Sequence, residues 1–208
     1  MPATNTDYNK LVIAMRYYLL GKKYFRAVQA MELGMSIHIG TRADHITPEF
    51  QHQMEMAHYL RTLESHLIFP EETFCCVFLH DVYEDYPEKV TLDMIERNFG
   101  DIVKTGVKVV SKPENFDKSN QCDYFDPIGL DPVGSITKGV DRINNLGSMV
   151  GVFSKTKQKK YVNEVEVYFL PMLKEARRLF PAQEPIYENI KFILISQITL
   201  LKEALYHE

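Results

Sequence analysis

Apolar residues recur along most of the chain at the three- and four-residue spacing of amphipathic helices, whereas the two-residue alternation of strands is scarce. Gly21 is placed to end the first predicted helix. Thr47 and Pro48 resemble an N-cap and first helical position, and Pro70 opens the next helix. The predicted helices cover approximately residues 7–20, 24–37, 47–66, 70–84, 91–99, 101–111, 135–153, 156–180 and 184–206. We therefore expect an all-α fold of about nine helices.

Two features interrupt the helical pattern. Residues 112–134, KPENFDKSNQCDYFDPIGLDPVG, contain three prolines and two glycines, and they predict a long loop of the kind that forms a lid or a mobile segment. Within this loop we expect Asp123, Tyr124 and Asp126 to face solvent. Pro171 lies inside the predicted helix 156–180 and should kink it.

Composition narrows the class of protein. The 208 residues are 45% hydrophobic, which predicts one folded domain over residues 1–208 and excludes a disordered chain. A net charge of -4 gives no support to a nucleic-acid partner. No apolar run reaches the ~18–20 residues that cross a bilayer, and the N-terminus lacks the pattern of a secretory signal. Three cysteines without a disulfide or zinc spacing fit a reducing compartment, so we expect a cytoplasmic protein without a membrane partner.

The first candidate chemistry lies in FLHDVYED, residues 78–85, where four ionisable residues end an apolar helix. On a helix, residues four apart share a face, so Glu84 follows His80 and Asp85 follows Asp81. A neutral imidazole beside a carboxylate makes a pair of ligands for a divalent metal that accepts nitrogen and oxygen. The two acids one turn later are well placed to handle a metal-bound water.

Further ligands are needed to complete such a site. His52 lies in TPEFQHQMEMAHYL, and Asp141 shares a helix face with Asn145 in KGVDRINNLGS. Each motif alone has a structural explanation: a histidine on a helix is often a satisfied core residue, and Asp141 with Arg142 can form an ion pair. The combination is more specific, because the candidates occupy separate predicted helices in a consistent order.

This ordered set of motifs resembles the HD-domain metal-dependent phosphohydrolases and, within them, the Rel/Spo-type alarmone hydrolases. The similarity covers about residues 25–180. The family's first motif, an Arg, a Thr-Pro and a His, is matched by Arg42, Thr47-Pro48 and His52. HDVYED matches the second motif, and VDRINN at 140–145 matches the third, usually ADRLHN. Residues 164–173 match a stretch that usually reads ETLEIYAPL, and NFGDIVKTGVKVVSK (98–112) resembles the flanking segment.

The resemblance implies a role for each matching residue. One metal ion, most often manganese, would have four protein ligands: His52, His80, Asp81 and Asp141. Two carboxylates would orient and activate the attacking water: Glu84 and Asp85. Four residues would contact the substrate. Arg42 would stack on the purine, and Asn145 would contact the ribose or phosphate. Ser148 would lie near the base, and Lys160 would supply positive charge.

The reaction implied by the resemblance is removal of pyrophosphate from the ribose 3′ position of guanosine tetra- or pentaphosphate. The expected partner is therefore a small nucleotide. General chemistry agrees, since a divalent cation lowers the pKa of bound water and a neighbouring carboxylate accepts its proton. A chain of 208 residues would be a stand-alone hydrolase without the synthetase and regulatory domains of long Rel/Spo proteins.

Two basic clusters could attract such an anionic substrate or could form solvated faces. SKTKQKK (154–160) is the first, and Lys22, Lys23 and Arg26 form the second. Of all these, Lys160 alone matches a basic family position. Arg142 is expected to be a structural partner of a carboxylate.

Three departures from the family pattern keep the substrate open. Ala43 stands where the family often has Lys, Gly147 replaces a frequent Arg, and Phe169 replaces a Tyr, all expected around the substrate. One alternative is an HD phosphohydrolase that acts on a nucleoside mono- or triphosphate or a cyclic nucleotide. Another is a non-catalytic alarmone-binding module, although binding alone does not require both Glu84 and Asp85.

Overall fold

A computed structural model describes residues 5–112 and 121–206, and within these ranges it contains helices and one isolated bridge but no strand. The α-helices are α1 (Asn5–Lys22), α2 (Phe25–Ile37), α3 (Gln51–Arg61), α4 (Pro70–Asp85), α5 (Leu92–Phe99), α6 (Asp101–Val110), α7 (Cys122–Gly129), α8 (Gly134–Ser148), α9 (Lys155–Glu164), α10 (Leu170–Leu179) and α11 (Glu184–Tyr206). Two 3-10 turns, η1 (Glu64–His66) and η3 (Pro181–Gln183), and a π-helix, η2 (Val165–Phe169), complete the order. The all-α prediction is confirmed.

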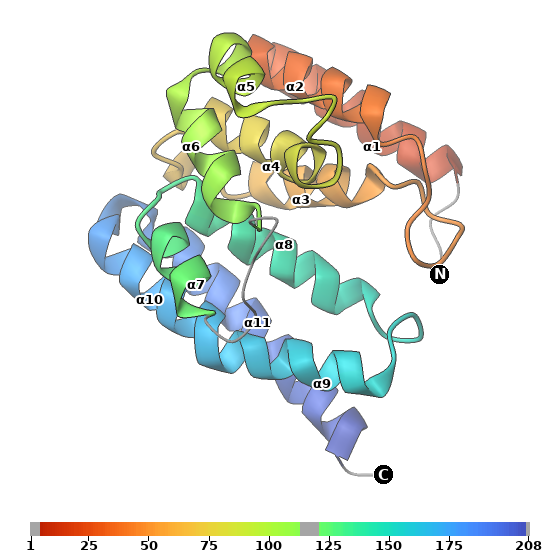
Figure 1. The fold of residues 1–208 in the computed structure, drawn as a ribbon, viewed down its shortest axis with the longest axis vertical. Helices are drawn as coiled ribbons and strands as arrows, with labels where there is room; N and C mark the ends of the chain where they lie inside the picture. The colour runs from red at the N-terminus through yellow and green to blue at the C-terminus, as the bar shows by residue number, and fades with distance from the viewer. Residues whose placement is uncertain (1–4, 113–120, 207–208) are drawn as a thin grey trace.

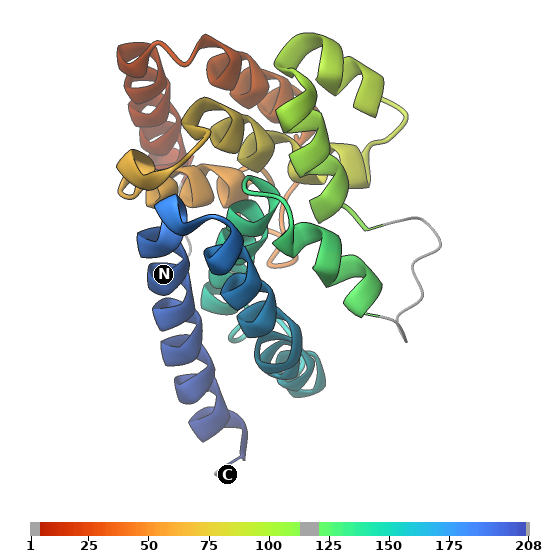
Figure 2. The ribbon, with the colours of Figure 1, turned by 90° about the vertical axis from the view of Figure 1, so that its left-hand side faces the viewer.

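Helix α8 lies between two groups of helices (Figures 1 and 2). It packs against α3, α4 and α6 of the N-terminal group, and against α7, α10 and α11 of the C-terminal group. Helix α4 in turn packs against α2, α3 and α6. The helices that carry the candidate ligands, α3, α4 and α8, are therefore mutual neighbours in the middle of the molecule.

The core fixes the position of α4. Its apolar run from Phe74 to Leu79 is fully buried. Helix α2 approaches α4 closely at Gly34, where an added Cβ would lie 2.4 Å from the Phe50 ring and 2.8 Å from the carbonyl oxygen of Phe78. Only glycine fits this contact. The close packing holds the helix whose last turns contain His80 and Asp81.

Helix α7 corrects the prediction of a loop over 112–134. Tyr124, Phe125 and Ile128 have helical spacing and are buried, and the Tyr124 hydroxyl donates a hydrogen bond to the carbonyl of Val110 at 2.5 Å. The expectation that Tyr124 faces solvent was wrong, whereas Asp123 and Asp126 are exposed. These buried aromatic residues outweigh the local proline signal. Residues 113–120 lie outside the described residues, so the loop prediction stays untested there.

Two helix boundaries also differ from expectation. Helix α1 continues through Gly21, and the chain turns at Lys23, which has a φ of 62°. Helix α3 begins at Gln51, because the Thr47 hydroxyl donates to the Asp44 carboxylate at 2.5 Å in a local turn and does not cap the helix. Side-chain hydrogen bonds of this kind compete with helix capping.

The predicted helix 156–180 is divided by the π-helix η2 into α9 and α10. Pro171 is the second residue of α10, directly after η2. Because proline lacks a backbone N–H and its ring clashes with the preceding turn, a locally wider helical turn accommodates it. The predicted disturbance at Pro171 is thus present as a π-helix. Helix α8 also ends at Ser148, earlier than the predicted 153.

Within the described residues, none of the helices combines the length and the apolar character that crossing a bilayer requires.

Candidate metal centre

Helices α3, α4 and α8 bring the four predicted metal ligands together. One potential ligand atom from each of His52, His80 and Asp81 lies within 4.8 Å of the others. Asp141 joins the group through His52, whose Nε2 is 3.1 Å from Asp141 Oδ1. Both histidines and Asp141 are buried, and Asp81 is partly exposed. The structure therefore assembles the set that the sequence pattern predicted.

The His80 ring presents a lone pair to this cluster. Its Nδ1 is 2.9 Å from the Val77 carbonyl oxygen, which can only accept, so Nδ1 carries the proton. Nε2 is therefore unprotonated in the neutral ring, is buried, and has no hydrogen-bond partner among the described residues. It lies 3.1 Å from Asp81 Oδ1. Two lone-pair atoms in such close contact are typical of ligands that converge on a cation.

The His52 ring is oriented by a chain of two further side chains. The Asn144 Nδ2 donates to Glu55 Oε2 at 2.7 Å, and a carboxylate can only accept. The amide oxygen of Asn144 must then face His52, where it lies 2.7 Å from Nδ1. This arrangement protonates Nδ1 and leaves Nε2 for the cluster. Sequence reasoning missed Asn144 and Glu55, although Glu55 is three residues after His52 and so shares its helix face.

Asp141 is held ionised by its neighbours. Lys138 Nζ lies 3.2 Å from Oδ2, and Asn145 Nδ2 donates to Oδ1 at 2.5 Å. Burial raises the pKa of Asp141, but the charge of Lys138 and the close contact with His52 lower it well below its ordinary value overall. Burial likewise opposes protonation of His52, yet Asp141 raises the pKa of His52 overall. Lys138 was missed, although its i, i+3 spacing to Asp141 is visible in KGVD.

Asp81 lies between the two imidazoles. Its Oδ1 contacts His80 at 3.1 Å, and its Oδ2 lies 3.9 Å from His52 Nε2. Gln53, a buried residue that sequence reasoning also missed, donates from Nε2 to Asp81 Oδ2 at 2.8 Å. The carboxylate is thus oriented by a neighbouring side chain, as metal-binding carboxylates usually are.

This donor set fits a divalent transition metal. Two imidazole nitrogens and two carboxylates suit Mn²⁺, Fe²⁺ or Zn²⁺ better than a purely oxygen-seeking ion such as Ca²⁺. The hydrogen bonds to Val77 and Asn144 supply the outer-shell support that metal-binding histidines need.

The two predicted water-handling acids lie at the end of α4 and are exposed. Glu84 accepts a hydrogen bond from the backbone N–H of Lys112 at 3.2 Å. Asp85 belongs to a different group of possible ligands, in which one ligand atom from each of His38, Glu49 and Asp85 lies within 4.8 Å of the other two. Although the residue as a whole is exposed, partial burial of its carboxyl group, then the charges of Asp81 and Glu84, raise the pKa of Asp85 to about 6.

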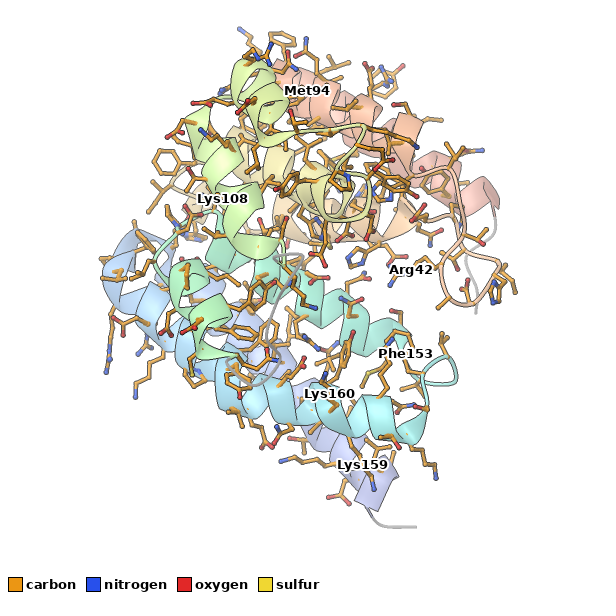
Figure 3. The ribbon with its side chains drawn as sticks, viewed as in Figure 1. Arg42, Met94, Lys108, Phe153, Lys159 and Lys160 are labelled. Carbon is orange, nitrogen blue, oxygen red and sulfur yellow. The ribbon has the colours of Figure 1, made fainter. Side chains whose placement is uncertain are left out.

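Of the four predicted substrate contacts, Arg42 and Asn145 lie at the cluster. The Arg42 Nη2 donates to Asn145 Oδ1 at 3.4 Å, and Asn145 in turn contacts Asp141. The Ser148 hydroxyl donates to the Asn144 carbonyl one turn earlier, so it satisfies its own helix. Figure 3 shows Arg42 on the loop between α2 and α3 and Lys160 on α9. The Lys160 side chain is 56% exposed and lies 3.7 Å from Glu164.

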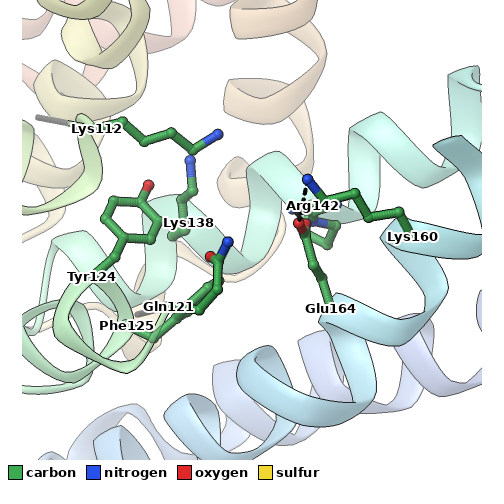
Figure 4. Close-up of a pocket in the computed structure, with 8 residues that line it drawn as sticks. All are labelled: Lys112, Gln121, Tyr124, Phe125, Lys138, Arg142, Lys160 and Glu164. Carbon is green, nitrogen blue, oxygen red and sulfur yellow. Dashed lines mark hydrogen bonds and ion pairs between the residues drawn. The ribbon is translucent and has the colours of Figure 1, made fainter. Parts of the chain in front are cut away.

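A small cavity of about 60 Å³ is lined in part by Lys138 (Figure 4), the residue that contacts Asp141. It is lined by four basic residues, one acid and three other polar or aromatic side chains: Lys112, Lys138, Arg142, Lys160, Glu164, Gln121, Tyr124 and Phe125. Burial, then the charge of Lys138, lowers the pKa of Lys112. The excess of positive charge makes this cavity suited to an anion, and Lys138 connects it directly to Asp141.

Arg142 is a structural partner, as expected. Its Nη2 donates to Glu164 at 2.8 Å, and its guanidinium lies 4.1 Å from the Tyr161 ring centroid and 4.4 Å from that of Phe169. Phe169 is itself fully buried beneath Arg142, and its expected place around the substrate stays a prediction. Gly147 faces Gln197 of α11, whereas Ala43 is exposed beside Arg42.

The second basic cluster lies away from the candidate ligands. Arg26 contacts Glu71 and Glu72 in the first turn of α4, and Lys22 contacts Glu64. His80 is eight residues further along α4 than Glu72, a helical rise of about 12 Å. These cations therefore form structural ion pairs.

Comparisons with known proteins give no match: the sequence fits no family model, and no curated protein resembles it detectably.

Proposed function

We propose that this chain is a metal-dependent phosphohydrolase of the HD-domain type that converts guanosine 3′,5′-bis(diphosphate) to GDP and pyrophosphate. The observation that carries the proposal is the convergence of His52 Nε2 and His80 Nε2 on the Asp81 carboxylate, with both rings held in the tautomer that exposes a lone pair. A divalent cation, with Mn²⁺ as our first choice, would replace these lone-pair contacts by bonds.

Four residues would hold the cation: His52, His80, Asp81 and Asp141. When bound, it would lower the pKa of a water molecule and neutralise phosphate charge. The chain's own groups prepare the site. Lys138 and Asn145 keep the Asp141 carboxylate ionised and oriented, and Gln53 does the same for Asp81. Glu84 and Asp85, one turn further along α4, would orient the water and accept its proton.

The basic cavity supports a substrate that carries a phosphate group, because its four cations favour an anion. One of its four cations, Lys138, contacts Asp141 at 3.2 Å. The Arg142 Nε and Nη1 atoms are buried and have no hydrogen-bond partner among the described residues. Such groups are costly to bury unless a ligand or water accepts their hydrogen bonds. A phosphate oxygen would be a suitable acceptor.

Arg42 would recognise the base. Its guanidinium contacts Asn145, one helical turn after the metal ligand Asp141. Stacking of a guanidinium on a purine contributes about 0.5–2 kcal/mol, enough for recognition. Hydrolysis of a different nucleotide is the second candidate. It is favoured by Ala43, which is exposed beside Arg42 at a position where the resembled family often has Lys.

We further propose that the protein is cytoplasmic. Its three cysteines support this, since Cys75, Cys76 and Cys122 are all free thiols.

The test is turnover of a panel of nucleotides by the purified chain with Mn²⁺, with products separated by chromatography. GDP and pyrophosphate from the tetraphosphate are expected. Turnover of another nucleotide alone would establish the second candidate. Saturable binding with no product from any nucleotide would overturn hydrolysis and establish a binding module. When a candidate ligand is replaced, as in Asp81→Asn, the control for loss of a carboxylate is Asp126→Asn, at an exposed aspartate of α7.

A further inference from the structure

A second group of possible metal ligands lies beside the first. His38 follows the end of α2, Glu49 precedes α3, and Asp85 is the last residue of α4. One potential ligand atom from each lies within 4.8 Å of the other two. Within the group, His38 Nδ1 lies 3.3 Å from Glu49 Oε1. Three separate segments thus converge on one point.

The His38 ring is buried without a hydrogen bond. Its side chain is 1% exposed, and neither ring nitrogen has a hydrogen-bond partner among the described residues. The ring packs edge-on against Tyr86, with centroids 5.1 Å apart, and lies 6.1 Å from the Phe50 ring. Burial of a polar ring with both nitrogens unsatisfied is costly, so an unseen partner is expected.

We propose that His38, Glu49 and Asp85 bind a second divalent cation, separate from the one assigned to His52, His80 and Asp81. One imidazole and two carboxylates match the ligand preference of Mn²⁺, Fe²⁺ and Zn²⁺. The two negative charges would also balance the charge of the ion. The proposal concerns metal binding alone and does not depend on the hydrolysis of any nucleotide.

A simple ion pair between His38 and Glu49 explains less. The 3.3 Å contact lacks hydrogen-bond geometry, it leaves Nε2 unsatisfied, and it does not explain why Asp85 approaches the same point. The Glu49 carboxylate already has donors on one side, because the Gly40 N–H and the Tyr86 hydroxyl both lie 3.3 Å from Oε2. Its Oε1 has only a longer contact of 3.5 Å with the Tyr86 hydroxyl and lies closer, at 3.3 Å, to His38 Nδ1.

The position of this group gives the second cation a role. The chain between His38 and Glu49 forms a loop that contains Arg42 (Figure 1, between α2 and α3). Two backbone hydrogen bonds close this loop: the Glu49 N–H donates to the Gly40 carbonyl at 3.0 Å, and the Arg42 N–H donates to the Thr47 carbonyl at 2.9 Å. A cation bound by both ends of the loop and by Asp85 would fasten the loop to α4. It would thereby fix Arg42 relative to the first site.

The test titrates Mn²⁺ into the full chain after all metal has been removed. The electron paramagnetic resonance signal of free Mn²⁺ then gives the number of ions that each chain binds. The wild type is expected to bind two ions. Glu49→Gln and His38→Gln should each bind one, and so should Asp141→Asn, which affects the first site. Glu88→Gln is the matched control, because it removes an exposed negative charge near Tyr86 without removing a ligand, and it should still bind two.

The outcomes separate the two sites. A wild-type count of one that Asp141→Asn abolishes and Glu49→Gln preserves would overturn the second site and leave the first intact. Two ions in Glu49→Gln would also overturn it. A single ion lost only in Glu49→Gln would support the second site while contradicting the first.

An anomalous diffraction map from crystals with Mn²⁺ should show a peak between His38 and Glu49. Circular dichroism checks that each variant is folded.

Discussion

The amide oxygen of Asn144 lies 2.7 Å from Nδ1 of His52, and this contact decides which ring nitrogen faces the candidate ligands. Because Glu55 fixes the orientation of the Asn144 amide, the proton must stay on Nδ1. Metal-binding histidines commonly depend on such a partner. The candidate site therefore includes residues, such as Asn144 and Glu55, that orient a possible ligand without being one themselves.

Asn144→Ala should weaken Mn²⁺ binding at the first site by about 10–100-fold, since removal of an outer-shell partner typically has that effect. The ring would lose its fixed tautomer and orientation. Calorimetric titration of metal-free protein measures the change. Asn98→Ala, at an exposed position on α5, should leave the affinity unchanged. Equal affinities of the two variants would show that Asn144 does not orient a ligand.

Lys160→Gln should raise the KM for a multiply phosphorylated nucleotide by a few fold and leave kcat nearly unchanged. Lys160 lines the basic cavity but is 56% exposed, so solvent screens its charge. The effect should shrink as salt is added. Lys159→Gln is the control, because this neighbour on α9 does not line the cavity. A rise in KM of the same size for both variants would point to a general effect of charge.

Asp85 should titrate with a pKa of about 6 in the metal-free protein, because burial and the charges of Asp81 and Glu84 disfavour its ionised form. Carboxyl carbon NMR measures this value, and Asp81→Asn should lower it. The raised pKa also has a consequence for stability. The folded state holds the proton more tightly than the unfolded chain, so this contribution is fully present below about pH 4 and is lost as the pH rises through about 6. A measured pKa near 4 would contradict the arrangement of these three carboxylates.

Gly34→Ala and Gly21→Ala should change stability in opposite directions. At Gly34 the new methyl group would overlap the Phe50 ring and the Phe78 carbonyl, so the melting temperature should fall. At Gly21, in the last turn of α1, nothing lies within 4 Å of the added atom. There alanine should stabilise the helix by up to about 1 kcal/mol. Thermal unfolding compares the two, and equal stability of both variants would mean that α2 does not approach α4 closely.

Much of the helical order was predictable because apolar spacing records which face of each helix is buried. The boundaries of α4 and α5 were predicted to within about two residues. Pro70 begins α4 and Gly100 ends α5, and both signals depend only on the local sequence. Helix α7 was missed because its stability comes from burial of Tyr124 and Phe125 against distant parts of the chain. Local proline and glycine signals contain no information about such contacts.

The candidate ligands could be singled out from the sequence because each motif contains a chemically distinctive residue, and in the structure His52, His80, Asp81 and Asp141 lie close together. Their binding of a metal stays a prediction. Their supporting residues could not be singled out in this way. Asn144, Lys138 and Gln53 are ordinary polar residues whose roles arise only when α3, α4 and α8 pack together. The grouping of Asp85 with His38 and Glu49 likewise depends on how the loop after α2 folds back.

The central claim is that a divalent cation at His52, His80, Asp81 and Asp141 enables hydrolysis. The most direct measurement is pyrophosphate release from guanosine 3′,5′-bis(diphosphate) by metal-stripped protein, before and after Mn²⁺ is restored, in the wild type and in Asp81→Asn. We predict no release without metal, recovery with Mn²⁺ in the wild type, and no recovery in Asp81→Asn. Full activity of the stripped protein, or of Asp81→Asn, would contradict the claim.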